Sequence, residues 1–138
     1  MNTRRTARRI VTGHDAAGRS VIAADDRLPM TPGATEDRRT LAEIWATGPR
    51  DGVSASGTIR VVDIPPGGRR EPHATDTVDY AIVLEGALWL TLDAAETELL
   101  AGDIVVQRGT RHGWENRADA IARVVFVNLT GQADAAAV

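Results

Sequence analysis

The second half of the chain consists of short apolar runs separated by turn residues. Residues 58–64 and 79–84 are rich in valine and isoleucine, and residues 65–68 between them read Pro-Pro-Gly-Gly. Proline and glycine at such short intervals exclude long helices from this half. Short β-branched runs with frequent turns are typical of a β-sandwich or a β-barrel. The sequence therefore predicts an all-β fold whose barrel spans residues 58–130.

The remaining strands of this barrel follow from the same pattern. They are expected over residues 71–75, 87–92, 97–100, 104–107 and 122–129. Glu85 and Gly86 stand between two of the runs, which is a signal for a hairpin. We therefore expect the strands over residues 79–84 and 87–92 to pair with each other.

The first 57 residues carry weaker signals. A hairpin is predicted with strands at residues 9–12 and 19–24 around a turn at residues 13–18. Residues 25–37 contain two prolines and a glycine and are expected to form a loop. Residues 40–47 fit one helical face and also alternate as a strand, so their conformation stays open.

The chain is divided into four parts on these grounds. They are a flexible basic arm over residues 1–9, N-terminal strands and loops packing on the barrel over residues 10–57, the barrel over residues 58–130, and a frayed tail over residues 131–138.

Composition excludes several classes of function. All sixteen basic residues are arginines, and the chain contains neither lysine nor cysteine. Disulfides, thiolate metal sites, cysteine nucleophiles and lysine Schiff bases are therefore excluded. The net charge of −3 gives no reason to expect nucleic acid. No secretory signal and no run of roughly 20 apolar residues is present, so we expect a cytoplasmic protein without a membrane partner.

Polar side chains cluster at the start of the second barrel strand. His73, Thr75, Thr77 and Asp79 share parity, so in an extended chain they would leave the same face. Polar groups on the inward face of an apolar sheet need partners, which a metal, a ligand or water can supply. His112 follows a strand and its Arg-Gly turn and is the obvious further member of this cluster.

The spacing of this first stretch resembles a motif of the cupin superfamily. In cupins a glycine is followed by His-x-His, then a glutamate, then a second glycine. Here Gly67 is followed after five residues by His73-x-Thr75, after three more by Asp79, and after six more by Gly86.

A second stretch resembles the second cupin motif in the same order along the chain. Gly109 is followed after two residues by His112 and after three more by Asn116, and residues 102–103 form the preceding Gly-Asp turn. Residues 8–15 and 79–86 further resemble small single-domain cupins. The resemblance implies a double-stranded β-helix, or jelly-roll barrel, with an N-terminal hairpin extension, and it implies a homodimer.

The same resemblance implies a ligand set for a metal ion. A typical cupin binds its metal through three histidines and a glutamate, whereas this chain has Thr75 and Asp79 at two of those positions. His73, Asp79 and His112 remain, and two imidazoles with a carboxylate suit one divalent Fe, Mn, Ni or Zn ion. The alternatives are a metal-free, hydrogen-bonded polar cluster and three plain structural residues.

Candidate site residues follow from these stretches. His73, His112 and Asp79 are the candidate catalytic residues. The candidate substrate-binding residues are Thr75, Arg60, Gln107, Trp114 and Trp45.

Acid–base or metal-assisted chemistry is what this set can perform. The leading hypothesis is a lyase, a dehydratase or a decarboxylase, acting on a largely apolar small molecule such as a polyketide-like or aromatic carboxylate. The alternatives are a metal-dependent dioxygenase on the same residues and a non-catalytic small-molecule binding cupin.

Overall fold

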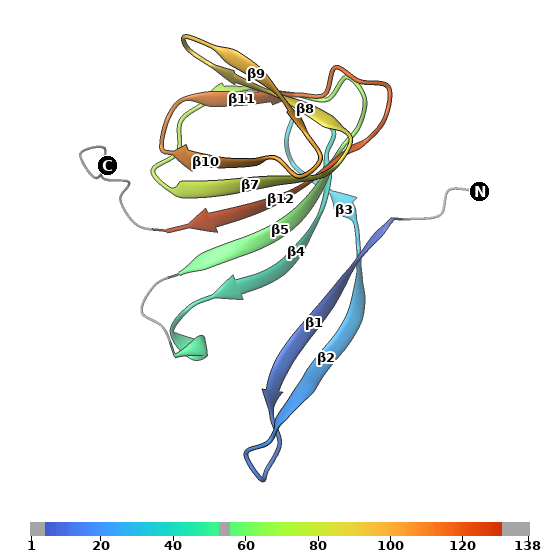
Figure 1. Ribbon diagram of the computed structural model, residues 1–138, viewed down its shortest axis with the longest axis vertical. Helices are drawn as coiled ribbons and strands as arrows, with labels where there is room; N and C mark the ends of the chain where they lie inside the picture. Colours follow the sequence, from blue (N-terminus) through green and yellow to red (C-terminus); the bar gives the residue numbers. More distant parts are fainter. Residues whose placement is uncertain (1–4, 53–55, 131–138) are drawn as a thin grey trace.

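The computed structural model describes residues 5–52 and 56–130, and these are built almost wholly of β-strands (Figure 1). The elements are β1 (Thr6–His14), β2 (Ser20–Pro29), β3 (Thr31–Pro32), β4 (Thr40–Thr47), the short 3₁₀ helix η1 (Pro49–Asp51), β5 (Gly57–Ile64), β6 (Arg69–His73), β7 (Val78–Glu85), β8 (Ala87–Leu92), β9 (Glu96–Leu100), β10 (Ile104–Arg108), β11 (His112–Glu115) and β12 (Ala122–Leu129). Within the described ranges, no helix is long and apolar enough to cross a bilayer.

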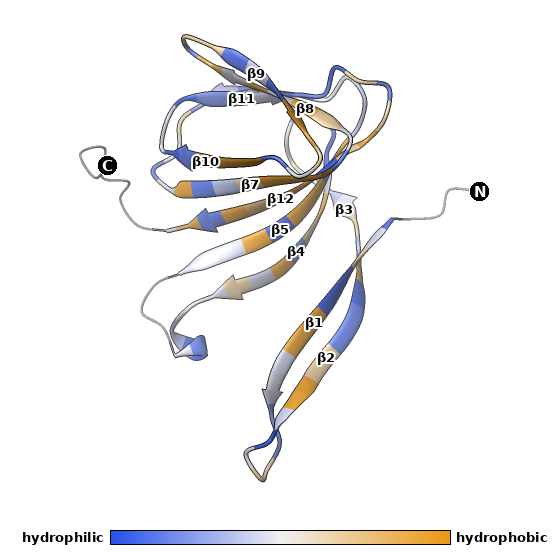
Figure 2. Cartoon of the chain, in the orientation of Figure 1, coloured by the Kyte–Doolittle hydropathy of each residue, from blue (hydrophilic) through white to orange (hydrophobic). Residues whose placement is uncertain are grey.

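Two antiparallel sheets face each other and form the barrel. One has the strand order β10-β7-β12-β5-β4-β3, and the other has the order β6-β11-β8-β9. Apolar side chains from both sheets fill the space between them, and Figure 2 shows how strongly β10 and β7 are apolar. The predicted all-β jelly-roll barrel with an N-terminal hairpin is confirmed.

Side-chain alternation sorts each strand into an inward and an outward face. On β12, Ala122, Val124 and Phe126 are buried, and on β5, Val62 and Ile64 are buried opposite them. Burying side chains of this kind contributes roughly 1.5–3 kcal/mol each. The packing of these inward faces therefore holds the two walls of the barrel together.

The connection at Gly86 differs from the prediction. β7 pairs with β10 and β12, whereas β8 pairs with β9 and β11, so the expected hairpin between β7 and β8 is wrong. Gly86 instead carries the chain from one sheet to the other with a φ of 73°. A Cβ at this position would lie 2.5 Å from the carbonyl oxygen of Ile121, so only glycine fits the crossing.

The N-terminal hairpin is longer than predicted. β1 begins at Thr6, inside the segment expected to be a flexible arm, and β2 reaches Pro29, inside the segment expected to be a loop. Bidentate ion pairs of Arg8 with Asp25 and of Arg9 with Asp26 join the two strands. Polar residues read as a loop therefore form a strand, because their charges are paired across the hairpin.

The hairpin projects away from the barrel and contacts it near its base (Figure 1). Ala7 and Met30 pack there against Ala42 and Val61 of the barrel. Residues 40–47, whose conformation the sequence left open, form β4 with a bulge between Glu43 and Trp45. The tail expected over residues 131–138 lies outside the described residues.

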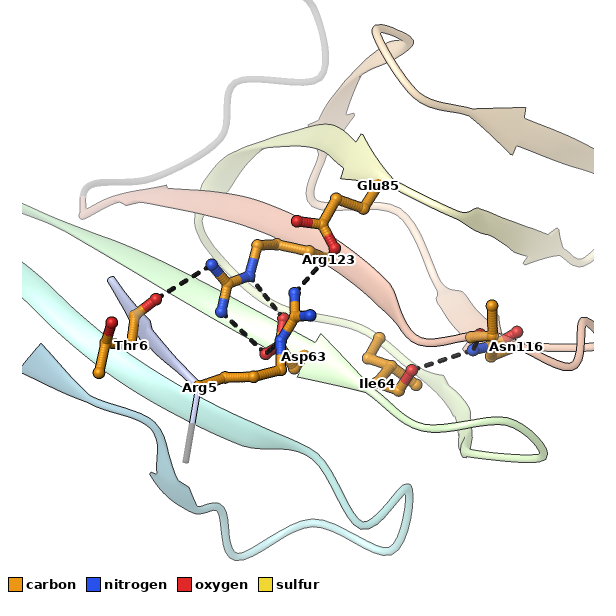
Figure 3. A network of polar contacts seen from close by, with 8 residues as sticks. Arg5, Thr6, Asp63, Ile64, Glu85, Asn116 and Arg123 are labelled. Carbon is orange, nitrogen blue, oxygen red and sulfur yellow. Dashed lines mark hydrogen bonds and ion pairs between the residues drawn. The ribbon is translucent and has the colours of Figure 1, made fainter. Parts of the chain in front are cut away.

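Asp63 joins the N-terminal segment to the barrel (Figure 3). Arg123 donates to both of its carboxylate oxygens at 2.7 and 2.9 Å, and Nε of Arg5 donates to one of them at 2.7 Å. Arg5 also donates to Glu85, at 2.8 Å. The Asp63 side chain is only 4% exposed, so its charge depends on these two guanidinium groups.

Replacing Asp63 by asparagine should lower the free energy of unfolding by about 3 kcal/mol, because removing one partner of a buried ion pair leaves the others uncompensated. The matched control is Asp25→Asn, which breaks an exposed pair and should cost much less, because solvent screens that pair. Urea unfolding of the two variants measures the difference. Equal losses would contradict the structural role of Asp63.

Candidate active site

A cavity of about 160 Å³ opens between the two sheets of the barrel. Its walls are formed by Thr35, Arg39, Arg60, Arg70, His73, Thr75, Asp79, Ala81, Gln107, His112, Trp114, Phe126 and Asn128. Seven of the eight predicted site residues are therefore brought together, and Trp45 is the exception. The lining is more polar than expected, because its apolar side chains are only Ala81, Trp114 and Phe126.

The two histidines lie side by side. His73 ends β6 and His112 begins β11, and the two residues are direct partners in the antiparallel register. Their ring centroids are 4.7 Å apart with the planes tilted by 47°. Trp114 packs edge-on against His112 at 5.6 Å, so an aromatic wall supports the inner imidazole.

Backbone carbonyls set the orientation of both imidazole rings. Nδ1 of His112 lies 2.8 Å from the carbonyl oxygen of Thr110, and Nδ1 of His73 lies 3.2 Å from that of Glu71. A carbonyl oxygen only accepts hydrogen bonds, so Nδ1 carries the proton in each ring. In the neutral form, Nε2 is therefore the basic atom of both histidines.

Burial lowers the pKa of His112 below the ordinary histidine value of 6.5. The nearby charges of His73 and Arg70 lower this pKa further, whereas the hydrogen bond to Thr110 and the charge of Asp79 oppose the shift. His112 is therefore neutral at pH 7 and able to accept a proton.

Asp79 belongs to a polar row at one end of the larger sheet. It faces Asn128 of β12 and Gln107 of β10 in the strand register. Thr77 donates to Asp79 at 2.7 Å, and the amide of Gln107 donates to Thr110. The hydrogen bond from Thr77 therefore holds the Asp79 carboxylate at the cavity wall.

The segment from His73 to Asp79 is not extended throughout, whereas the shared parity of its polar side chains assumed an extended chain. β6 ends at His73 and β7 begins at Val78. His73, Thr75 and Asp79 nevertheless line the cavity, whereas Thr77 contacts it only through Asp79.

The residues present do not fit the expected metal ion. In the described part of the chain, no three histidine, aspartate or glutamate side chains converge closely enough to hold one. Thr75 supplies a hydroxyl where a metal-binding cupin has a second histidine, and that hydroxyl is a poor ligand for these ions. His73, Asp79 and His112 all line the cavity, but among the described residues they do not converge as a three-ligand set.

Arginines dominate the opposite wall. Nη2 of Arg60 donates to Oδ1 of Asn128 at 2.7 Å. Arg39 binds the buried carboxylate of Asp37 through Nε and Nη2, at 2.6 to 3.0 Å. Sequence reasoning missed Asn128, although an amide two positions after Phe126 in an apolar strand was a usable signal.

Trp45 lies outside the cavity. Its ring stacks under the guanidinium of Arg50 at 5.0 Å, and its Nε1 is 3.4 Å from Asp51. The bulge between Glu43 and Trp45 interrupts the alternation of side chains along β4. The side of the sheet on which Trp45 lies therefore cannot be predicted from alternation. Trp114, by contrast, is buried and lines the cavity.

Known proteins resemble this chain in sequence and fold. The phomopsin biosynthesis cluster protein C' of Diaporthe leptostromiformis is 39% identical over 91% of this chain and 79% of its own length. The cupin-domain-containing oxidoreductase fogC of Aspergillus ruber is 30% identical over 78% of this chain and 63% of its own length. The polyketide cyclase RemF of Streptomyces resistomycificus shares the fold, with a TM-score of 0.57 and 24% identity over 75% of this chain and 71% of its own.

The family match covers the barrel itself. Residues 60–128 match the cupin domain, and this range contains both motifs and both cavity histidines. Sequence, strand arrangement and relatives agree, and the chain belongs to the cupin family.

Proposed function

We propose that this cupin is a lyase that eliminates a small group from an organic substrate by acid–base chemistry. The observation that carries the proposal is the pair of adjacent imidazoles, each held with Nε2 as its basic atom. Relatives in biosynthesis clusters support a role in small-molecule metabolism. The polar lining favours a polar substrate over the largely apolar one that the sequence suggested.

Elimination of water illustrates the step. Nε2 of His112 takes a proton from the carbon next to a carbonyl group, and the freed electron pair forms the carbon–carbon double bond. The bond from the next carbon to its hydroxyl oxygen breaks, and that oxygen takes the proton that Nε2 of His73 carries when the ring is doubly protonated, and leaves as water. His112 then loses its proton to solvent, and His73 regains one. The guanidinium groups that line the cavity supply positive charge, which steadies the negative charge that develops on the substrate oxygen.

A metal-dependent dioxygenase is the second candidate, although it would need His73, Asp79 and His112 to converge more closely than they do in the described chain. The observation that favours it is the similarity to a cupin-domain-containing oxidoreductase of Aspergillus ruber. The two candidates differ in what they consume, because a dioxygenase incorporates O₂ and a lyase does not.

The first prediction concerns the product. A host metabolite extract incubated with the protein should yield a product lighter than its precursor by one water or one carbon dioxide, detected by mass spectrometry. The yield should be unchanged under argon and after chelator treatment. A heavier product carrying label from isotopically labelled O₂ would establish the dioxygenase instead, and saturable binding without a product would establish a binding module.

The second prediction concerns the histidines. His112→Ala should lower kcat by about 10²–10⁴-fold, because a positioned general base contributes that much. His73→Ala should cause a loss of similar size, because the third histidine of the chain, His14, does not line the cavity and cannot replace it. His14→Ala is the matched control, since this third histidine lies at the exposed end of β1 and should leave kcat unchanged. Wild-type turnover in both cavity variants would overturn the assignment.

The third prediction concerns pH. His112 acts in its neutral form, so kcat/KM should fall as the pH drops through its pKa. Burial lowers that pKa, so the midpoint of the fall should lie below the ordinary value of 6.5. Proton NMR titration of the three histidine ring signals, assigned with the alanine variants, checks the same value without a substrate. A midpoint above 6.5 for His112 would contradict the proposed base.

A further inference from the structure

We propose that Arg60 is the anchor of an anion subsite that holds a carboxylate of the substrate during the reaction. Naming the bound molecule as the substrate rests on the proposed function, whereas the subsite itself does not. The ligand class is a small organic acid whose carboxylate remains in the product.

Two unpartnered atoms point to this ligand. Among the described residues, the buried side-chain nitrogen and oxygen atoms without a hydrogen-bond partner are Nε of Arg60 and Oγ1 of Thr75. Both residues line the same cavity. A buried polar group without a partner is destabilising by roughly 1–3 kcal/mol, so a ligand that satisfies both atoms recovers that free energy on binding.

Arg60 also differs from the other arginines of the cavity in its lack of an ion-pair partner among the described residues. Arg39 is neutralised by Asp37 at 2.6 Å and Arg70 by Glu36 at 3.1 Å. Arg60 has only the neutral amide of Asn128 as a bonded partner, and it forms no ion pair in the described part of the chain. The cavity therefore holds one guanidinium whose counter-charge is missing.

Carboxylates of the protein act on Arg60 only from a distance. Glu43 and Asp79 raise the pKa of Arg60, but burial and the charge of Arg39 lower it by more. Asp79 is bonded to Thr77, and Glu43 is exposed although it faces Arg60 in the strand register. A ligand carboxylate on Nε would form a charge-assisted hydrogen bond in this partly buried setting, where such bonds are strong.

The position of Arg60 also suits the proposed step. Arg60 lies on β5 of the larger sheet, whereas His73 and His112 lie on the smaller sheet across the cavity. Phe126 and Trp114 pack edge-to-face at 5.5 Å and form an aromatic wall of the cavity. A substrate held by its carboxylate at Arg60 would present the rest of its skeleton to the imidazoles.

The subsite distinguishes between the two lyase reactions. Binding to a guanidinium stabilises a carboxylate in the ground state, which opposes its loss as carbon dioxide. A carboxylate held at Arg60 is therefore the part that is kept. We accordingly infer elimination of water rather than decarboxylation.

Benzoate and benzamide are the probes that test this subsite. A cavity of about 150 Å³ accepts a benzene ring in other proteins, and the present one is of that size. Isothermal titration calorimetry of the wild-type protein should show benzoate binding at least about 10-fold more tightly than benzamide, because only the carboxylate supplies a negative charge that compensates the guanidinium. Equal binding of the two probes, or no binding of benzoate, would overturn the proposal.

Substitutions of arginine test whether Arg60 causes the preference for benzoate over benzamide. Arg60→Gln should remove the preference for benzoate while keeping the binding of benzamide, and Arg60→Lys should reduce the preference. The matched control is Arg69→Gln, whose arginine is exposed and outside the cavity, and it should keep the wild-type preference. Persistence of the full preference in folded Arg60→Gln would overturn the proposal.

A crystal structure of the wild-type protein with benzoate provides a measurement that does not depend on how the variants fold. The carboxylate should lie within hydrogen-bond distance of Nε of Arg60, and a carboxylate bound elsewhere would overturn the proposal. His112→Ala should retain the benzoate preference while losing turnover. Failure of the lyase assay with an intact preference would therefore refute the proposed reaction and leave the subsite standing.

Discussion

The alternation of side chains on the larger sheet controls both the stability of this protein and its chemistry. Val62, Val124 and Val83 form one inward row across β5, β12 and β7. Two rows further along the same face lie Asn128 and Asp79. The same face of the sheet therefore packs the core at one end and lines the site at the other. Strand pairing keeps the core residues and the site residues aligned in rows across the sheet.

This continuity explains which features the sequence could predict. The two motifs placed His73 and His112 correctly because their spacing puts one at the end of a strand and the other at the start of its direct partner. Asp79 was predicted from the first motif, and the strand register places it opposite Gln107. Arg39 could not be predicted, since it reaches the cavity from a loop where no periodicity applies and is held by its pair with Asp37.

Other errors have equally local causes. The polar strand over residues 25–29 resembled a loop because its charges are satisfied by partners on β1, which the local sequence does not reveal. Gly86 resembled a hairpin turn because positive φ is needed both for a tight turn and for the crossing that is found. The pairing of two copies, expected from the resemblance, stays a prediction.

The residues at and near the first motif favour stabilisation of negative charge by arginine. Thr75 stands where a cupin that binds a metal has a histidine, and its hydroxyl has no partner. Across the cavity, Arg60 provides a fixed positive charge. A site that has one imidazole ligand fewer and contains arginine can still stabilise negative charge, because guanidinium groups supply part of what a metal ion supplies elsewhere.

The cavity has one wall that includes the edge strand β6 and an opposite wall of strands that are paired on both sides. β5, β7 and β12 are each paired on both sides, whereas β6 lies at the edge of the four-stranded sheet. Edge strands open locally at a lower free energy than central ones, so amide hydrogens of β6 exchange with solvent sooner. His73 lies on this edge strand, whereas Arg60 and Asp79 lie on strands that are paired on both sides. Local opening of β6 would therefore displace one of the two cavity histidines and leave the opposite wall in place.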